Sequence, residues 1–538
     1  MKNNKVRLYC IMFLIFGLVP FIMGLSGCER TISPPAPPET FLRLQKDNIL
    51  NSQILKKGIK YAVFLPKDYD STTSNYPVVY LLHGMGDNES AWYMDGAISY
   101  YVDANAATVA PMIFVMPQGF NTYWVNQFDG NFSYMDMLVN EMVPAIDAKY
   151  RTVKDPQHRA VMGYSMGGYG ALILPAKNPT VFKTGVALSM SYRTDQQYMD
   201  ESQDGWNVQW GKVFGSVGSI GTARLTDYYK ANNPFYFFKN PGDLSLNGQN
   251  YYFDCGDDEE NLSQPNDELH DLLRDLNIKH EYRVRNGGHS WDYWHSALPD
   301  ALRYISYSFG NRTFPDDPDR TYTGPVVQAE RIFAEKLQGS EINFSVTVPA
   351  AYLSDTKSYA VILVLHDRKA TDQETESQNL RALLSMNMTS FKMPAALIVE
   401  IPLQTEPVTV AAFQNIIKQV RIKYRAIPDN KHTILLGNNR AGLLAFDLAP
   451  QCSGLINACL LFDANLPEDA LAHISDVSYY LDIGDEGINY KNYHALYMSL
   501  RHVRVNHEYR VRQGTPSHDS FLNGLNESAG FMNIHLNL

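Results

Sequence analysis

Short apolar runs alternate with longer amphipathic stretches along the chain from residue 59 onward. Apolar runs bounded by glycine, proline or aspartate are typical of buried strands, and the stretches between them have helical spacing. The predicted strands of the first part of the chain are residues 61–66, 76–82, 111–117, 159–162, 185–189, 250–256 and 280–284. The predicted helices are residues 134–150, 171–174 and 268–276. This alternation predicts an α/β sheet.

The order of elements repeats later in the chain. The later runs that echo earlier strands are residues 343–349, 361–367 and 396–402. Residues 507–512 repeat the letters His-Glu-Tyr-Arg-Val-Arg of residues 280–285. Internal repetition of this kind indicates a duplicated unit. The length of 538 residues also exceeds that of one ordinary domain.

A polar, proline-bearing segment separates the two copies. We predict a first domain at residues 41–312, a linker at 313–325 and a second domain at 326–538. Both domains are expected to have the same α/β architecture.

The N-terminus has the pattern of an export signal. Basic residues precede an apolar run at residues 11–25, which is shorter than the roughly 20 residues that a membrane-spanning helix needs. The letters Leu-Ser-Gly-Cys at 25–28 resemble a bacterial lipobox, in which Cys28 is diacylated and becomes the first residue of the mature protein. We therefore expect a signal peptide at 1–27, a stiff proline-rich tether at 28–40 and a lipid anchor in the bacterial cell envelope, in the outer membrane or at the cell surface. A single-pass anchor is the alternative.

Composition narrows the class of partner. The formal net charge of −11, with no basic block, argues against nucleic acid. Aromatic residues make up 12% of the chain, which suits a surface for carbohydrates or aryl esters and equally a large core. Cys255, Cys452 and Cys459 lack metal-type spacing and are expected to be buried free thiols. The pattern leaves the oligomeric state open.

The letters Gly-Tyr-Ser-Met-Gly at residues 163–167 lie between a predicted strand and a predicted helix. This is the context of a nucleophile elbow, where glycines two residues before and after the serine let the chain reverse sharply. The hydroxyl of Ser165 would stand above the sheet, and the backbone N–H of Met166 would point at a forming oxyanion. A glycine-rich turn with an incidental serine is the alternative.

Two other turns follow predicted strands and complete the set that hydrolase chemistry needs. His83, Gly84 and Met85 end the second strand, and small residues there let the amide of Met85 or Gly84 serve as the other oxyanion donor. An acidic run at residues 257–260 and His289 in a glycine turn both come after the serine and just past strand ends. Serine, acid and histidine in that order match the chain order of an α/β-hydrolase.

These motifs, taken together over residues 41–312, resemble an esterase family that includes feruloyl esterases and acetylxylan esterases of carbohydrate esterase family 1. The resemblance implies an α/β-hydrolase fold and an acid, normally aspartate, three residues after the glycine that ends its strand. Counting from Gly256 leads to Glu259, which departs from that pattern. Asp258 therefore stays as the alternative acid.

The expected reaction is ester hydrolysis through an acyl-enzyme. Ser165 would attack the ester carbonyl, His289 would act as base and then acid, and Glu259 or Asp258 would orient the imidazole. No metal or organic cofactor is expected. The aromatic residues expected to contact the substrate are Tyr164, Trp124 and Trp291.

The resemblance and the predicted export favour acetyl or feruloyl groups on plant-type polysaccharides as substrates. An acyltransferase with the same triad, a peptidase of the same fold and a non-catalytic glycan-binding lipoprotein are the alternatives. A long aromatic insertion at residues 190–250, with Trp206 and Trp210, is expected to form a lid or a substrate wall.

The second copy departs from the first at the elbow. Asn439 stands where Ser165 stands, and an amide is no acyl-forming nucleophile. His366-Asp367 replaces His83-Gly84 at the oxyanion turn. The residues that persist in triad-like places are His518 and Asp485 or Glu486. We therefore expect two tandem α/β-hydrolase-like domains, of which the second is catalytically degenerate.

Overall fold

The computed structural model of the chain describes residues 43–215, 217–239, 248–259, 261–314, 331–366, 373–403, 408–467, 474 and 476–537. The predicted signal peptide and tether, including Cys28, lie outside these residues, as do Asp367 and most of the predicted linker. Each helix within the described part of the chain is too short or too polar to cross a membrane. The described residues up to 314 are called the first half, and those from 331 the second half.

The strands form one mixed sheet of sixteen strands in the order β1-β2-β4-β3-β5-β6-β7-β8-β16-β15-β14-β13-β11-β12-β10-β9. The strands of the first half are β1 (Leu44–Ser52), β2 (Lys57–Phe64), β3 (Val78–Leu82), β4 (Ile113–Pro117), β5 (Arg159–Tyr164), β6 (Thr184–Leu188), β7 (Asn250–Gly256) and β8 (His280–Arg285). Those of the second half are β9 (Arg331–Lys336), β10 (Asn343–Val348), β11 (Ala360–His366), β12 (Ala396–Pro402), β13 (Thr433–Asn438), β14 (Ala458–Phe462), β15 (Ser478–Gly484) and β16 (His507–Arg512). From each outer edge inward, the two halves have the same strand order.

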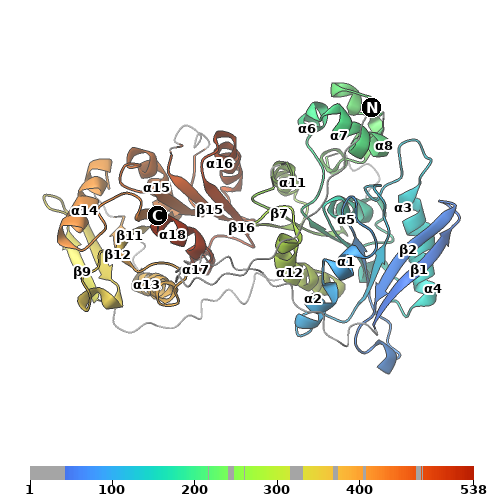
Figure 1. The fold of residues 1–538 in the computed structure, drawn as a ribbon, viewed down its shortest axis with the longest axis horizontal. Coiled ribbons are helices and arrows are strands. Elements are labelled where there is room, and N and C mark those ends of the chain that lie inside the picture. The colour runs from blue at the N-terminus through green and yellow to red at the C-terminus, as the bar shows by residue number, and fades with distance from the viewer. Residues whose placement is uncertain are drawn as a thin grey trace, which may run out of the picture. The chain divides into compact units, whose positions relative to one another are not determined.

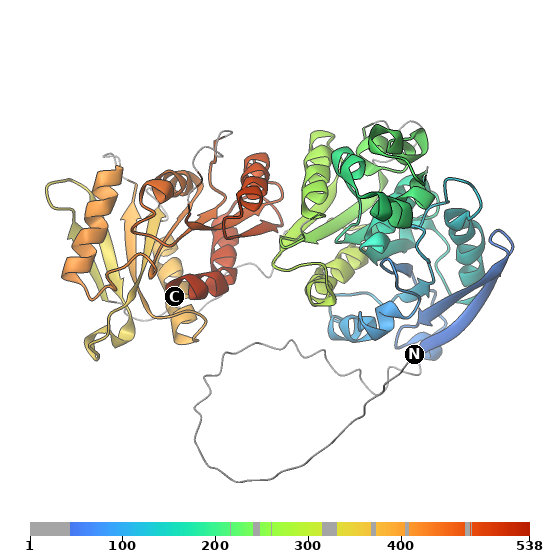
Figure 2. The same cartoon turned by 45° about the horizontal axis from the view of Figure 1, so that its top comes forward.

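Strand direction also matches between the halves. In each half the two outermost pairings are antiparallel and the pairings from the third strand inward are parallel. The antiparallel pair β8 and β16 joins them, with Val284 opposite Val511. Figures 1 and 2 show the strands in blue to light green for the first half and in yellow to red for the second, with helices around both sets.

Helices cover both faces of the strands because strand residues alternate between two apolar cores. In β3, Val78, Tyr80 and Leu82 join one core, whereas Val79 and Leu81 join the other. The helices on the second core of the first half are α1 (Ala91–Met94), α2 (Ile98–Ala104) and α12 (Trp291–Phe309). The corresponding helices of the second half are α13 (Gln373–Thr389), α17 (His518–Glu527) and α18 (Ala529–Leu536) (Figure 1).

The predicted α/β fold is confirmed, with strands within a few residues of the predicted runs and β7 and β12 at the predicted bounds. The division into two tandem domains stays a prediction. Strand β1 was not predicted, because its partly exposed, polar sequence has no apolar run. Cys255, Cys452 and Cys459 are buried free thiols, as predicted.

Candidate active site

Ser165 lies in the sharp turn between β5 and helix α5 (Met166–Lys177). Its backbone has φ 57° and ψ −120°, a conformation that costs a non-glycine residue free energy and persists only where the surroundings enforce it. A Cβ at Gly163 would lie 2.2 Å from the carbonyl oxygen of Gly167, and one at Gly167 would lie 2.1 Å from that of Leu82. Glycine at both positions is therefore what permits the turn and holds the hydroxyl at the carboxyl end of the strand.

His289 lies between Ser165 and a buried carboxylate. Its Nε2 is 2.9 Å from the Oγ of Ser165, and its Nδ1 is 2.7 Å from Oε2 of Glu259. Because the carboxylate accepts a hydrogen bond, the proton of the neutral imidazole belongs on Nδ1, which leaves the Nε2 lone pair facing the serine. The geometry is that of a nucleophile, a base and an orienting acid.

The side chain of Glu259 is fixed on its other oxygen. Oε1 accepts hydrogen bonds from the Oγ of Ser189 and, at 3.1 Å, from the backbone N–H of Gly256. Ser189 in turn accepts a hydrogen bond of 2.8 Å from the indole N–H of Trp294. The Glu259 side chain is only 1% exposed, so these donors hold its carboxylate in one orientation.

Asp258, the alternative acid, is exposed and is not brought to His289. Its backbone N–H donates to the carbonyl of Gly287 at 3.0 Å, which directs the neighbouring residue inward instead. Of the two candidates, the structure therefore brings Glu259 together with His289 and Ser165. No metal-binding group of three or more His, Cys, Asp or Glu residues occurs within the part of the chain that the structure describes.

His83 orders the turn predicted to supply the second oxyanion donor. Its Nδ1 lies 2.7 Å from the carbonyl oxygen of Gly84, and its Nε2 accepts from the backbone N–H of Gly119 at 2.8 Å. Across a trans peptide bond, the carbonyl of Gly84 and the N–H of Met85 point in opposite directions. Pulling that carbonyl inward therefore turns the N–H of Met85 outward, and Met85 is 42% exposed.

Burial lowers the pKa of His83 to about 4, although its hydrogen bond to Gly84 opposes that shift. An unfolded histidine has its usual pKa of about 6.5, so the unfolded chain binds more protons between these two values. Stability is therefore full above about pH 6.5 and falls as the pH decreases toward 4, by about 2 kcal/mol at pH 5 for this residue.

We expect urea unfolding at pH 7 and pH 5 to show this loss in the wild type and a loss smaller by about 2 kcal/mol in His83→Asn. The other buried histidines are present in both proteins and cancel in the comparison. An equal loss in the two proteins would mean that His83 is not held neutral.

The aromatic residues near the site have other positions than predicted. Trp124, expected to contact substrate, is 0% exposed and packs edge-on against His83 with ring centroids 5.2 Å apart. Tyr164, also expected to contact substrate, is 1% exposed, donates a hydrogen bond of 2.6 Å to Asp87 and packs on Trp291 and Trp294. Trp124 and Tyr164 thus pack behind the turn at His83 and Gly84, and of the three predicted aromatic residues Trp291 alone is partly exposed.

The insertion between β6 and β7 is a folded cap rather than an aromatic wall. Its helices are α6 (Asp195–Asp200), α7 (Gln203–Gly205), α8 (Gly211–Phe214), α9 (Asp227–Ala231) and α10 (Pro234–Phe237). Trp206 and Trp210 are fully buried among them, and Trp210 packs on Tyr123 with centroids 4.6 Å apart. Burial of both tryptophans means that these rings do not form the predicted substrate wall, and the other prediction for the insertion, a lid, stays a prediction.

Residues of the second half hold the loop that carries Glu259. Oδ2 of Asp257 accepts from Nη1 of Arg510 at 2.6 Å and from the backbone N–H of Tyr509 at 3.0 Å. Its backbone oxygen accepts from Tyr497 and Arg501, each at 2.7 Å. The remaining carboxylate oxygen accepts from the N–H of Gly287 at 3.0 Å, in the turn that leads to His289. One buried aspartate thus ties both triad loops to β16.

The contact between Arg510 of the second half and Asp257 of the first has an equivalent in which the first half provides the arginine and the second half the aspartate. Nη1 of Arg283 donates to Oδ2 of Asp485 at 2.6 Å, and Oδ1 of Asp485 accepts from the N–H of Gly514 at 2.7 Å. Both ion pairs are buried, with side chains at most 7% exposed. Asp485 is thus the counterpart of Asp257 and not of a triad acid, which corrects the prediction.

The second half lacks a triad. Counted from the strand-ending Gly484, the position of Glu259 is Gly487, and counted from Gly514, the position of His289 is Pro516. Asn439 keeps the elbow conformation, with φ 48°. His518, predicted in a triad-like place, is the first residue of α17 and corresponds to Trp291 at the start of α12. Glu486 corresponds to the exposed Asp258.

Residues 52–305 match the family model described as "Putative esterase". The endo-1,4-beta-xylanase/feruloyl esterase of Xylanibacter ruminicola is 30% identical over 176 residues, 30% of this chain and 24% of the relative. The acetyl esterase of Caldicellulosiruptor saccharolyticus is 25% identical over 268 residues, 47% of this chain and 95% of the relative. The diacylglycerol acyltransferase/mycolyltransferase Ag85A of Mycobacterium ulcerans is 26% identical over 322 residues, 54% of this chain and 87% of the relative.

The chain spans about a quarter of the length of the first curated relatives it matches, 24% and 25%. The family model covers most of the first half, including each residue of the candidate site. Together, the family model and the relatives named as esterases support an esterase.

Proposed function

We propose that this protein is a serine carboxylic-ester hydrolase that acts through an acyl-enzyme. The observation that carries the proposal is the chain of contacts from Ser165 Oγ to His289 Nε2 and from His289 Nδ1 to the buried Glu259. A half-buried serine with a base on one side and an acid fixed behind that base is the arrangement of an activated nucleophile.

The steps follow from these atoms. The Oγ of Ser165 forms a bond to the ester carbonyl carbon while its proton passes to Nε2 of His289. The tetrahedral intermediate expels the alcohol, which takes that proton, and leaves the acyl group on Ser165. Water then repeats the sequence, giving its proton to His289 and its oxygen to the acyl carbon, so that acid is released and Ser165 is restored.

Backbone N–H groups of Met166 and Met85 are the proposed oxyanion donors, with Gly84 the alternative to Met85. The N–H of Met166 belongs to the first turn of α5, where backbone donors have no partner within the helix. The positive end of the helix also faces the developing negative charge. The contact between His83 and Gly84 supports Met85 as the second donor.

We propose acetyl or feruloyl esters of plant-type polysaccharides or oligosaccharides as the substrate class, because one relative is named a feruloyl esterase and another an acetyl esterase. Turnover of p-nitrophenyl acetate, methyl ferulate and acetylated xylan by the purified protein tests this. Hydrolysis of p-nitrophenyl acetate alone would support the proposed ester hydrolysis and contradict a polysaccharide substrate.

An acyltransferase is the second candidate, and the likeness to a mycolyltransferase favours it. The same acyl-enzyme would pass its acyl group to a hydroxyl instead of water. Product analysis with and without a sugar acceptor distinguishes the two, since a transferase forms a new ester at the expense of free acid.

We further propose two tandem α/β-hydrolase-like domains, of which the second is catalytically degenerate. The matching strand orders support the duplication. Replacement of all three triad positions, by Asn439, Gly487 and Pro516, supports the loss of catalysis. A first-half variant without Ser165 should therefore retain no esterase activity from the second half.

The lipobox-like letters at residues 25–28 support a lipid-anchored protein of the bacterial cell envelope. In a bacterial host, the wild type should partition into detergent and carry a mass increment on Cys28. Cys28→Ala should lose both the mass increment and the membrane association.

The contacts of Asp257 predict that the second half affects catalysis. We expect Arg510→Met to lower kcat by about tenfold with KM within about twofold, because the loop bearing Glu259 loses its anchor while the binding surface is unchanged. Steady-state kinetics with p-nitrophenyl acetate measures this, and Arg510→Lys should restore part of the rate.

Arg283→Met is the matched control. It breaks the equivalent buried pair with Asp485 and should cost a similar amount of thermal stability, yet no triad residue depends on Asp485. Equal losses of kcat in the Arg510 and Arg283 variants would show a general effect on folding rather than positioning of the acid loop.

A further inference from the structure

The second half contains a cavity of about 480 Å³ at the carboxyl ends of its parallel strands. His366 ends β11, Asn438 ends β13, and Asn465 follows β14. The carboxyl edge is where open α/β sheets bind ligands, and the volume lies within the range of about 300–1,000 Å³ that is usual for small-molecule sites. The cavity occupies the place that corresponds to Ser165 and its surroundings in the first half.

Two substitutions account for this open space. In the first half, the rings of Tyr164 and Trp291 pack against each other with centroids 4.5 Å apart. Asn438 occupies the position of Tyr164, directly before the elbow residue, and His518 that of Trp291, at the first position of its helix. Both replacements are smaller and polar, so the second half has a polar cavity where the first has an aromatic cluster.

The cavity does not repeat the triad of the first half. Pro516 and Gly487 stand in place of the histidine and acid, and His366 of the lining is paired with Glu400 at 3.1 Å. Asp463, at the end of β14, accepts a 3.0 Å hydrogen bond from the N–H of Gly484, the group equivalent to the Gly256 donor that holds Glu259. The acid position is thus filled from another strand with no imidazole to orient.

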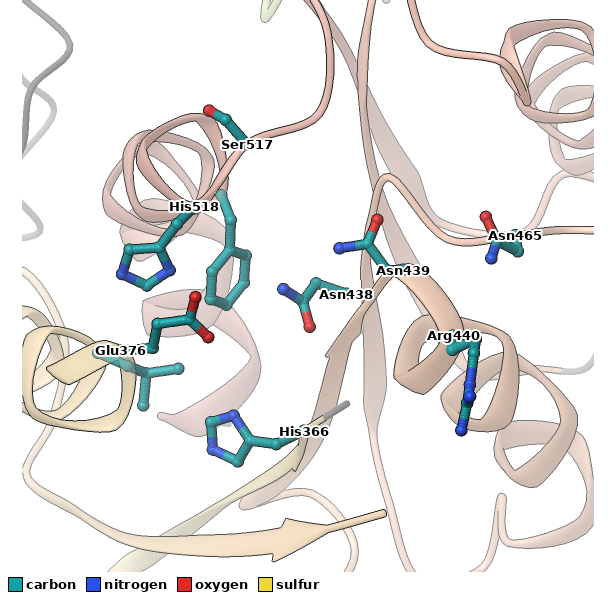
Figure 3. Close-up of a pocket in the computed structure, with 10 residues that line it drawn as sticks. His366, Glu376, Asn438, Asn439, Arg440, Asn465, Ser517 and His518 are labelled. Carbon is teal, nitrogen blue, oxygen red and sulfur yellow. The ribbon is translucent and has the colours of Figure 1, made fainter. Parts of the chain in front are cut away.

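The lining defines the class of ligand. Polar side chains come from separate segments of the second half, and they are His366, Glu376, Asn438, Asn439, Arg440, Asn465, Ser517 and His518. Figure 3 shows Glu376, Asn438, His366 and His518 turned toward one shared space. Carboxamides and a hydroxyl both donate and accept, whereas carboxylate only accepts. His366, Ser517 and Asn465 have partners in Glu400, Ser520 and Asn489, whereas the buried Nε2 of His518 has none among the described residues. An apolar ligand would leave such a group without a partner, at a cost of about 1–3 kcal/mol for each one buried.

Charge and shape narrow the class further. Glu376 and Arg440 contribute one charge of each sign to the lining, so a multiply charged ligand finds no matching field. Leu380 and Phe521 add an apolar patch. A ligand that has hydroxyl groups in several directions around a ring, and one apolar face on that ring, fits such a lining.

We propose that the second half binds, without cleaving it, a neutral hydroxyl-rich ligand of the sugar class in this cavity. The proposal deepens the proposed function, because a sugar held there would belong to the ester-bearing glycan on which Ser165 acts. The test uses Ser165→Ala protein, so that binding is measured whether or not the first half is an esterase.

Isothermal titration of full-length Ser165→Ala protein with xylotetraose is expected to show one saturable site. Asn438→Tyr with His518→Trp, added to that background, restores the aromatic pair that the first half tolerates and should fill the cavity. We expect this combination to raise Kd at least about tenfold with the melting temperature retained. Glu376→Gln, a milder change on the cavity rim, should raise Kd by about threefold or more.

Unchanged affinity in the cavity-filling variant would place the sugar elsewhere and overturn the proposal. So would the absence of binding by any neutral oligosaccharide in a panel of xylose-, glucose- and mannose-based probes. Tighter binding of an oligogalacturonate than of the neutral probes would overturn the assignment to a neutral ligand.

Discussion

Ser165→Ala is expected to lower kcat for p-nitrophenyl acetate by at least about 10⁴-fold and to abolish labelling by a fluorophosphonate. In the proposed mechanism the hydroxyl oxygen bonds to the acyl carbon, and the contact with His289 at 2.9 Å is the route by which the hydroxyl loses its proton. Alanine removes the hydroxyl and this path for its proton without adding bulk to the turn. The φ of 57° at residue 165 costs alanine no more free energy than it costs serine. Intact-mass analysis of the labelled wild type should locate the adduct on Ser165.

Asn439→Ala is the matched control, since it removes a polar side chain from the corresponding elbow of the second half. Turnover of the small ester should stay within about twofold of wild type, because no base or acid stands behind Asn439. A large loss in this variant would mean that the second half takes part in hydrolysis. Undiminished activity in Ser165→Ala would remove the acyl-enzyme from the mechanism.

The elements that position the nucleophile and base were predictable because the signals are local. A strand, a glycine-flanked serine and a helix lie within a short stretch around Ser165. Glycine is required on both sides of the serine because a Cβ there would lie 2.1–2.2 Å from a backbone oxygen. His289 was identified in the same way, by its glycine turn after a strand. In each case the residues that set the backbone are close neighbours of the residue that they position.

The choice between Asp258 and Glu259 was not local. Which side chain turns inward depends on Ser189, at the end of a different strand, and on Trp294, in a helix that follows the histidine. Counting from Gly256 ranks the two candidates, but it does not show the donors that hold one carboxylate. The sequence left both open, and the contacts decide which of them meets the imidazole.

The sequence also did not show which aromatic side chains are exposed. Tryptophan is a residue type that suits a ligand-binding surface, yet Trp124, Trp206 and Trp210 are each fully buried. The insertion folds by packing its own tryptophans together, since a segment of this length needs an apolar core to stay ordered. Distinguishing an internal core from a binding wall requires the partners of each ring, which are distant in the chain.

The sequence pattern of the two halves pairs His518 with the catalytic histidine, but backbone contacts pair it with Trp291. The two halves are matched at two pairs of glycines. Gly484 directly precedes Asp485 as Gly256 precedes Asp257, and Gly514 donates to Asp485 as Gly287 donates to Asp257. Once these are matched, Asn439, Gly487 and Pro516 stand at the positions of Ser165, Glu259 and His289. The repeated letters of residues 280–285 and 507–512 include Arg283 and Arg510, which make the equivalent contacts with Asp485 and Asp257.

Glu259→Gln is expected to lower kcat by about 10²- to 10⁴-fold with little change in KM. A carboxamide is close to the carboxylate in shape, but one of its two ends donates. The N–H of Gly256 and the hydroxyl of Ser189 require an acceptor at the Oε1 position, so the amide nitrogen would face Nδ1 of His289. That donor places the imidazole proton on Nε2, where it faces Ser165 and removes the base.

Asp258→Asn makes the same chemical change one residue earlier, on an exposed side chain, and should leave kcat within about twofold of wild type. Both variants are compared by steady-state kinetics at pH 7.5 with melting temperatures as the folding control. A loss in Asp258→Asn as large as that in Glu259→Gln would contradict the assignment, because an exposed carboxylate away from His289 has no means of setting its tautomer. Glu259→Asp, which keeps the charge but shortens the reach toward an imidazole 2.7 Å away, should fall between the two and thereby separate the contributions of charge and distance.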